Sequence, residues 1–128
     1  MTCSYLEVPA EAVPPEILRL ASQVLEVVCW GLSIPRPALR WYAPGRATGW
    51  FLRTFQRDAR SLGFVNDAAL HELWLRSELS ARQAVVTVLH EAIHLSQFWT
   101  GAHRTLSHEE REQRAHESSE SIATAWGW

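Results

Sequence analysis

The chain has 128 residues, enough for one domain with a buried core and too few for two. Hydrophobic residues make up 47% and charged residues 20% of the chain, the composition of an ordinary soluble globular protein. The formal net charge of -2 gives no electrostatic reason to expect a nucleic acid or an anionic membrane as a partner.

The sequence gives no sign of export or of membrane insertion. No apolar run approaches the ~20 residues of a membrane span. Residues 1–15 contain neither the basic region nor the apolar stretch of a secretory signal. Cys3 and Cys29 are too few and too scattered for a disulfide framework. We therefore expect a cytoplasmic protein.

The first predicted element is a helix that begins at Pro14, Pro15 and Glu16 and ends near Gly31 and Pro35. Proline is tolerated in the first turn, and an acidic residue there complements the helix dipole. Apolar residues then recur at three- and four-residue steps. The face that they form carries no titratable group, so we assign it to the core: Ile17, Leu20, Ala21, Val24, Val28 and Leu32.

Two short strands are predicted next, over residues 38–43 and 61–65, each followed by turn residues. The segment between them, residues 46–60, is compatible with a strand or a short helix around its aromatic residues, Trp50, Phe51 and Phe55. This segment also contains four arginines: Arg46, Arg53, Arg57 and Arg60. Their side chains could line a substrate groove, although a solvated basic face is the favoured interpretation.

The clearest period of two in the chain lies in residues 70–79 and predicts a strand. Leu73, Leu75 and Leu79 point to one side. The side chains of four further residues point to the other side of the strand: Glu72, Trp74, Arg76 and Glu78. The strand leads directly into the next helix.

That helix has a clear start and a clear end. Ser80 and Gln83 form a capping box, so we expect the helix to run from Ala81 to about Trp99, where Gly101 terminates it. A second capping box at Ser107 opens a last helix that continues to about residue 125, after a loop over residues 102–106.

The first of these helices contains a metal-binding motif. His90 and His94 stand four residues apart, so both imidazoles leave the same helix face and can bind one metal ion. Glu91 lies beside that face, where its carboxylate could take a proton from a metal-bound water. This is the H-E-x-x-H arrangement of zinc peptidases. Nearly all other residues from 84 to 95 are apolar, which predicts a buried helix whose polar groups need compensation.

Two histidines do not complete a zinc site, so a third protein ligand is needed. A stripe of Ala115, Ser119, Ile122 and Trp126 marks the inward face of the last helix, and extending it backwards by three residues reaches Glu112. We therefore expect Glu112 as the third ligand. Glu117 and Glu120 lie outside that face and remain the alternative candidates for the third ligand.

One further residue of the last helix is a candidate for catalysis. His116 lies one turn after Glu112 and is the best candidate for a group near the metal or on the oxyanion side of the reaction, although pairing with a neighbouring carboxylate is the more common role. No tyrosine follows the motif, so a group that stabilises the transition state would have to be a histidine or an arginine.

The run from Thr87 to His94, with the later segment from Glu112 to His116, resembles the gluzincin class of zinc peptidases. It looks closest to the small ImmA/IrrE-like and minimal-gluzincin peptidases. The resemblance implies that zinc is held by His90, His94 and Glu112, with Glu91 as general base. It also implies a short mixed sheet whose edge strand, just before the metal helix, aligns the substrate. That strand would be residues 70–79.

The expectation is therefore one α+β, zincin-like domain over residues 1–128, a zinc metallopeptidase acting on a peptide or protein substrate. The alternative is a non-catalytic, metal-stabilised domain that binds a protein partner, such as a regulator or a phage component. The chain ends in Trp126, Gly127 and Trp128. We favour packing of Trp126 in the core stripe of its helix. The other hypothesis is that this tail folds back over the metal site and shields it.

Overall fold

A computed structural model describes residues 2–44, 54–58 and 60–128, with side chains from residue 4 onward except in the 54–58 segment. This part of the chain holds five strands: β1 (Thr2–Val8), β2 (Ala38–Pro44), β3 (Thr54–Asp58), β4 (Gly63–Asn66) and β5 (Ala69–Arg76). Its helices are α1 (Pro15–Leu32), α2 (Ala81–Thr100) and α3 (His108–Ala125), with 3-10 turns at Ala10–Ala12 and Ala102–Arg104. The predicted α+β class is confirmed.

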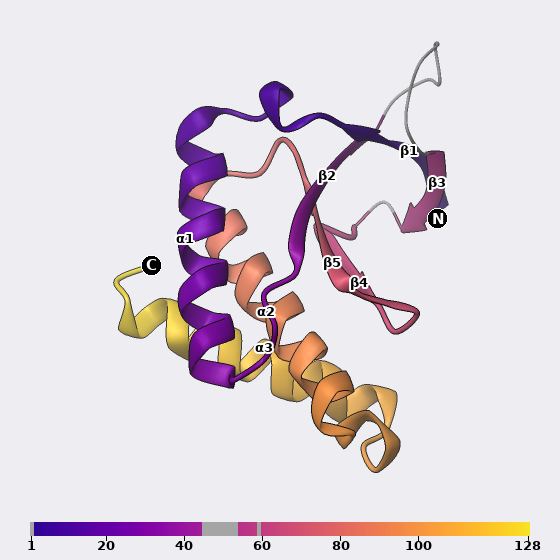
Figure 1. The fold of residues 1–128 in the computed structure, drawn as a ribbon, viewed down its shortest axis with the longest axis vertical. Coiled ribbons are helices and arrows are strands. Elements are labelled where there is room, and N and C mark those ends of the chain that lie inside the picture. Colours follow the sequence, from indigo (N-terminus) through magenta and orange to yellow (C-terminus); the bar gives the residue numbers. More distant parts are fainter. Residues whose placement is uncertain (1, 45–53, 59) are drawn as a thin grey trace.

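The strands form one mixed sheet in the order β3-β1-β2-β5-β4 (Figure 1). β2 and β5 run parallel, and every other neighbouring pair is antiparallel. The prediction that the strand before the metal helix is an edge strand is wrong, because β5 is paired with β2 on one side and β4 on the other. The edge on that side of the sheet is β4. The sequence reading also missed β1.

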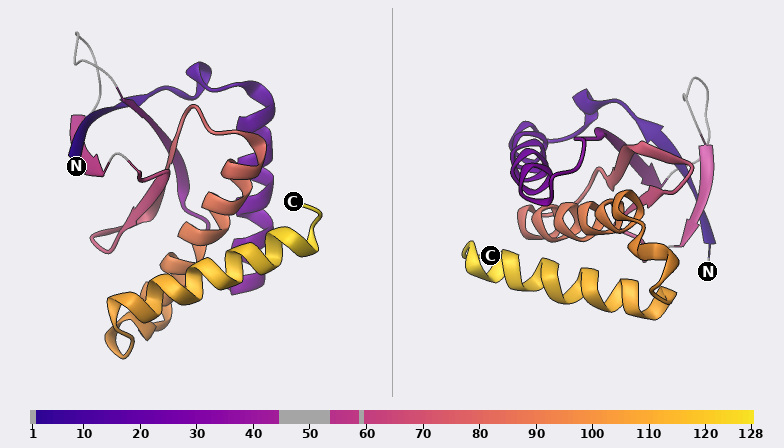
Figure 2. Two further views of the ribbon diagram at one scale, coloured as in Figure 1. Left: turned by 180° about the vertical axis from the view of Figure 1, so that it is seen from behind. Right: turned by 60° about the horizontal axis from the view of Figure 1, so that its bottom comes forward.

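The three helices form two further layers. α1 and α2 lie side by side, and their apolar residues share one core with β2 and β5 (Figure 2). The centre of this core is fully buried and includes Leu25, Leu73, Leu75, Val88 and Leu89. α3 crosses α2 on the side away from α1 (Figure 2). α2 thus lies between α1 and the sheet on one side and α3 on the other.

The opposite face of the sheet carries a second apolar cluster. Tyr5, Tyr42 and Trp74 are buried there, and Phe64 packs against them. The Phe64 and Trp74 rings stack with centroids 5.6 Å apart, and Trp74 donates from Nε1 to Oε2 of Glu72 at 3.2 Å. The predicted alternation of β5 is therefore confirmed, with Leu73 and Leu75 in the first cluster and Trp74 in the second. Glu72 and Trp74 are buried as well, so both faces of β5 are covered at these positions.

The ends of the helices follow the predicted capping signals. Ser80 accepts from the backbone N–H of Gln83, whose side chain accepts in return from the Ser80 N–H. Ser107 and Glu110 make the same pair of hydrogen bonds at the start of α3. Gly101 ends α2 with φ 80, the left-handed conformation that glycine adopts at low cost. These caps fix where the two helices that carry the metal site begin.

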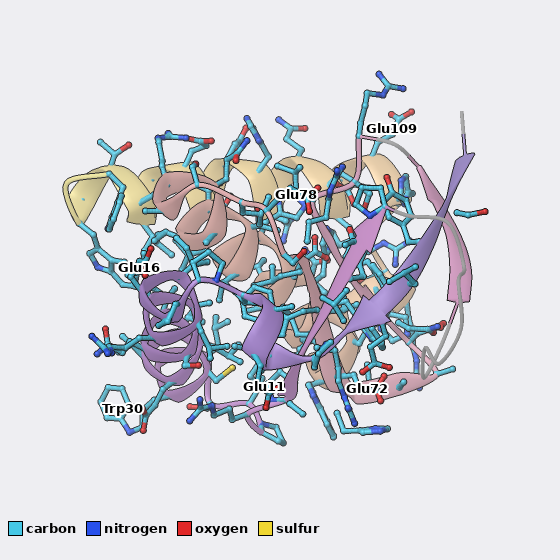
Figure 3. The ribbon with its side chains drawn as sticks, turned by 90° about the horizontal axis from the view of Figure 1, so that it is seen from above. Glu11, Glu16, Trp30, Glu72, Glu78 and Glu109 are labelled. Carbon is cyan, nitrogen blue, oxygen red and sulfur yellow. The ribbon has the colours of Figure 1, made fainter. Side chains whose placement is uncertain are left out.

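The outer face of α1 is exposed among the residues that the structure describes. Trp30 is 84% exposed, and Figure 3 shows its ring pointing away from the body of the protein. α1 therefore acts as a packing helix through its inner face alone, as its apolar stripe predicted. Among the residues that the structure describes, no helix combines the length and the apolar character needed to cross a membrane.

Candidate metal centre

The two histidines of the motif lie on one face of α2. Their Nε2 atoms are 3.1 Å apart, and the two rings are nearly perpendicular with centroids 4.7 Å apart. Both side chains are partly buried, at 22% and 13% exposed for His90 and His94. The four-residue spacing thus brings the two Nε2 atoms together, as predicted.

Glu112 reaches the same point from α3. Its Oε2 lies 3.3 Å from Nε2 of His90, and its Oε1 lies 3.0 Å from Nε2 of His94. Tetrahedral coordination with metal–ligand bonds of about 2.0–2.2 Å places neighbouring ligand atoms about 3.3–3.6 Å apart. The triangle formed by the two nitrogens and the carboxylate is close to that size. These three residues are positioned so that they could hold a metal ion.

Small residues bring α3 close enough for Glu112 to reach the histidines. Ala115 and Ser119, one and two turns after Glu112, are fully buried against α2. Because neither side chain extends far, the two helix axes can approach closely. Ala123 continues this buried stripe, whereas Trp126 is 43% exposed. The prediction that Trp126 completes the stripe is therefore wrong.

The alternative third ligands are engaged elsewhere. Glu117 accepts a hydrogen bond from Gln113 one turn before it, on the exposed side of α3. Glu120 forms an ion pair with Arg82 at the start of α2, with 3.0 Å between Oε2 and an Nη atom. The structure thus favours Glu112 among the three. His116 is exposed and is not among the residues that line the cleft at the metal centre.

Gln97 is a residue of the site that the sequence reading missed. It is 7% exposed, and its Oε1 lies 2.9 Å from Nδ1 of His94. Its Nε2 donates to the backbone carbonyl of Arg111 at 3.2 Å. Since an amide oxygen can only accept, Nδ1 of His94 carries the proton and Nε2 is free to bind a metal. The three-residue spacing from His94 to Gln97 was the available signal.

Glu91 is 9% exposed and lies in the same cleft without belonging to the ligand triangle. The cleft has a volume of about 550 Å³. One wall is formed by β4 and the residues just before it, the floor by α2, and the other wall by the start of α3. The predicted ligands and the predicted general base therefore share one cavity with the edge of the sheet.

Burial shapes the electrostatics of the centre. It lowers the pKa of His90, and the neighbouring His94 lowers it further, while the carboxylate of Glu112 acts in the opposite direction. Desolvation is the largest of these influences, because burial disfavours the charged imidazolium. The neutral imidazole, which is the form that binds a metal, is therefore favoured at neutral pH.

The four arginines of residues 46–60, for which the sequence favours a solvated face over a substrate groove, are described only in part. Arg60 is exposed and lines the cleft. Arg46 and Arg53 lie outside the described residues, as does the side chain of Arg57. The aromatic residues Trp50 and Phe51 and the side chain of Phe55 lie outside them as well.

The C-terminal tail does not cover the metal centre. The carbonyl oxygen of Trp128 accepts a hydrogen bond from Nε of Arg82 at 3.3 Å. Arg82 lies in the first turn of α2, two helical turns before His90, so the tail is held at the far end of that helix. The shielding hypothesis is therefore wrong for this structure. Trp128 is 40% exposed.

Comparisons with protein-family models, curated proteins and solved structures found no match to this chain. Its function is therefore inferred from the metal centre and the cleft around it.

Proposed function

We propose that this chain is a zinc-dependent metallopeptidase with a zincin-like fold. The observation that carries the proposal is the convergence of His90, His94 and Glu112 on one point, with the buried carboxylate of Glu91 in the same cleft. A purely structural metal site has no use for a carboxylate held beside the ligands, whereas hydrolysis needs a base at that position.

The donor set supports zinc as the metal. Two imidazole nitrogens and one carboxylate oxygen are the protein ligands of one large group of catalytic zinc sites, which keep a fourth position open. Zinc bound there would act as a Lewis acid on a peptide carbonyl and lower the pKa of a coordinated water toward ~7. The cleft beside the ligands gives substrate and water access to that open position.

The chain's own residues would supply the proton transfers. Glu91 follows His90 on α2 and is rotated by about 100° from it, so its carboxylate lies beside the ligands instead of among them. It would accept a proton from the attacking water and deliver it to the amine that leaves. His94 is held in the metal-binding tautomer by Gln97.

The sheet supplies a surface on which a peptide could be aligned. β4 is paired with β5 on one side, and no strand in the described part of the chain pairs with its other side. Residues 61–65, at and before β4, line the cleft. An extended peptide could add to this edge through backbone hydrogen bonds and cross the metal centre. We therefore assign the alignment of the substrate, which the sequence predicted for residues 70–79, to β4.

The decisive experiment compares wild-type protein with Glu91→Gln. Both are loaded with zinc and analysed for metal content, and then incubated with a broad peptide mixture whose products are identified by mass spectrometry. We expect one zinc per chain in both. Hydrolysis should be about 10²- to 10⁴-fold slower in Glu91→Gln, because the amide keeps the shape and cannot accept the proton.

Glu117→Gln is the matched control, since Glu117 is an exposed glutamate outside the cleft. It should retain both zinc and activity. Equal hydrolysis by wild type and Glu91→Gln would overturn the assigned role of Glu91. Zinc binding without cleavage of any peptide by the wild type would instead support the non-catalytic, metal-stabilised domain.

A further inference from the structure

The cleft contains a cation that the proposed chemistry does not use. Arg111 immediately precedes Glu112 on α3, and its side chain lines the cleft. Its Nε atom is buried and has no hydrogen-bond partner. Within the described ranges its guanidinium forms no hydrogen bond or ion pair, although its backbone carbonyl accepts from Gln97.

A buried N–H group without a partner is costly. Such a donor loses its hydrogen bonds to water on folding and gains none in return, and the cost is larger when the group is charged. Most buried polar groups in folded proteins have a partner, so each exception needs an explanation. Of the two such atoms in the described residues, Nε of Arg40 and Nε of Arg111, only that of Arg111 belongs to a residue that lines the cleft. Because Arg111 is held beside a metal ligand, the natural partner for its guanidinium is a group that arrives with the substrate.

The charges around the cleft indicate which group that is. Glu91 and Glu112 bring two negative charges, and Arg60 and Arg111 bring two positive charges. A divalent metal ion at the centre would offset both carboxylates, so the loaded cleft would keep the positive charge of Arg111, whose Nε has no partner. A cleft with this balance attracts an anion.

We propose that Arg111 binds a carboxylate of the substrate close to the bond that is cut. This inference rests on the proposed peptidase function and names its substrate class. The class comprises peptides with an aspartate or glutamate side chain, or a free C-terminal carboxylate, next to the scissile bond. The guanidinium matches a carboxylate because two parallel N–H groups can donate to its two oxygens.

A binding measurement tests the site without requiring hydrolysis. The probes are succinic acid monohydroxamate and its carboxamide counterpart, which share a zinc-binding hydroxamate and differ only in the carboxylate. Their affinities are measured by calorimetry on the zinc-loaded protein. Wild type should prefer the carboxylate probe by about 10- to 100-fold, the contribution of a charge-assisted hydrogen bond.

The variants show whether Arg111 is the source of that preference. Arg111→Met should remove it, and Arg111→Lys should keep a part of it, because lysine retains the charge and loses the fork. Arg114→Met is the matched control, since Arg114 is an exposed arginine on the same helix outside the cleft. It should behave as wild type. An absent preference in wild type, or an unchanged one in Arg111→Met, would overturn the proposal.

A cleavage measurement then separates the two sources of the carboxylate. Three sets of peptides are compared: acidic side chains with an amidated C-terminus, neutral side chains with a free C-terminus, and neutral side chains with an amidated C-terminus. A higher kcat/KM for the first set, lost in Arg111→Met, assigns the site to acidic side chains. The same result for the second set assigns it to the chain terminus.

The failures of the two proposals can be told apart. If wild type binds the carboxylate probe selectively through Arg111 but cuts no peptide, the peptidase function fails and the carboxylate site stands. If wild type cuts all three sets equally and binds both probes equally, the peptidase function stands and the carboxylate site fails.

Discussion

Nδ1 of His94 donates a hydrogen bond to Oε1 of Gln97 at 2.9 Å, and the same amide links α2 to α3 at the metal centre. Gln97 in turn donates from Nε2 to the carbonyl of Arg111, the residue directly before Glu112. The amide thus orients one ligand on α2 and holds the backbone that carries another ligand on α3. Neither task requires contact with the metal.

Replacing Gln97 by leucine should weaken zinc binding by about 10- to 100-fold, the range found for residues that orient metal ligands. Leucine removes both hydrogen bonds while preserving most of the buried volume. The affinity is measured by competition with a zinc-binding dye. Gln113→Leu is the control, because Gln113 is exposed and its side chain donates to Glu117, away from the metal centre. Equal affinities for Gln97→Leu and wild type would show that the amide has no influence on the centre.

Glu112→Ala should weaken zinc binding more than any change outside the ligand triangle, because it leaves only two protein ligands. Glu117→Ala and Glu120→Ala should bind zinc as wild type does, since these side chains interact with Gln113 and Arg82 away from the centre. Metal content after dialysis against a weak chelator measures the difference. Full occupancy in Glu112→Ala together with an empty site in either control would assign the third ligand to another glutamate.

Gly63 sets how closely β4 approaches the metal helix. A Cβ atom at this position would lie 2.7 Å from Cγ2 of Thr87 and 2.7 Å from the carbonyl oxygen of Trp74. Gly63→Ala should therefore destabilise the protein by about 1–3 kcal/mol, the usual cost of adding a methyl group to a packed contact. The close contact with Thr87 should also shift β4 away from α2 in this variant. Since Gly63 lines the cleft, that shift would change the shape of the cleft.

Gly31→Ala is the matched comparison in the same chain. Gly31 lies in α1, and a Cβ atom there meets nothing within 4 Å. Alanine should stabilise the protein at this site by about 0.5–1 kcal/mol, since it restricts the unfolded chain and favours the helix. Urea unfolding curves of both variants provide the test. Changes of the same sign in the two would mean that the contact of Gly63 with Thr87 does not control stability.

The sequence contained the local part of this structure. The capping boxes at Ser80 and Ser107 and the glycine at 101 act through hydrogen bonds and dihedral angles within a few residues, so their effect can be read directly. The spacing of His90 and His94 follows from helix geometry in the same way. Glu112 could be chosen because the buried stripe through Ala115 and Ser119 marks the face toward α2.

The arrangement of the sheet could not be read in the same way. β1 contains polar residues, and its partners β2 and β3 come more than 30 residues later in the chain. Whether β5 is an edge strand depends on where the short strand β4 pairs, and periodicity within β5 does not encode that. Trp74 is buried by aromatic residues from β1, β2 and β4, so its environment is likewise a property of the assembled sheet.

The stability of the metal-free protein should depend on pH through His90. Burial and the adjacent His94 lower the pKa of His90 in the folded state, whereas in the unfolded chain it returns to about 6.5. Below about pH 6.5 the unfolded state therefore binds a proton that the folded state does not. The free energy of unfolding should be independent of this group above that pH and should fall as the pH decreases, until the folded-state pKa is reached.

Urea unfolding of the metal-free protein between pH 7.5 and pH 5 measures this dependence. One proton contributes at most about 1.4 kcal/mol per pH unit. His90→Gln should show a shallower loss of stability, because glutamine does not titrate, and His108→Gln is the control, since His108 is exposed at the start of α3. Identical slopes in wild type and His90→Gln would contradict the lowered pKa. Zinc binding to the folded protein should weaken only as the pH approaches the lowered pKa of His90, because the metal and the proton then compete for one nitrogen of the imidazole.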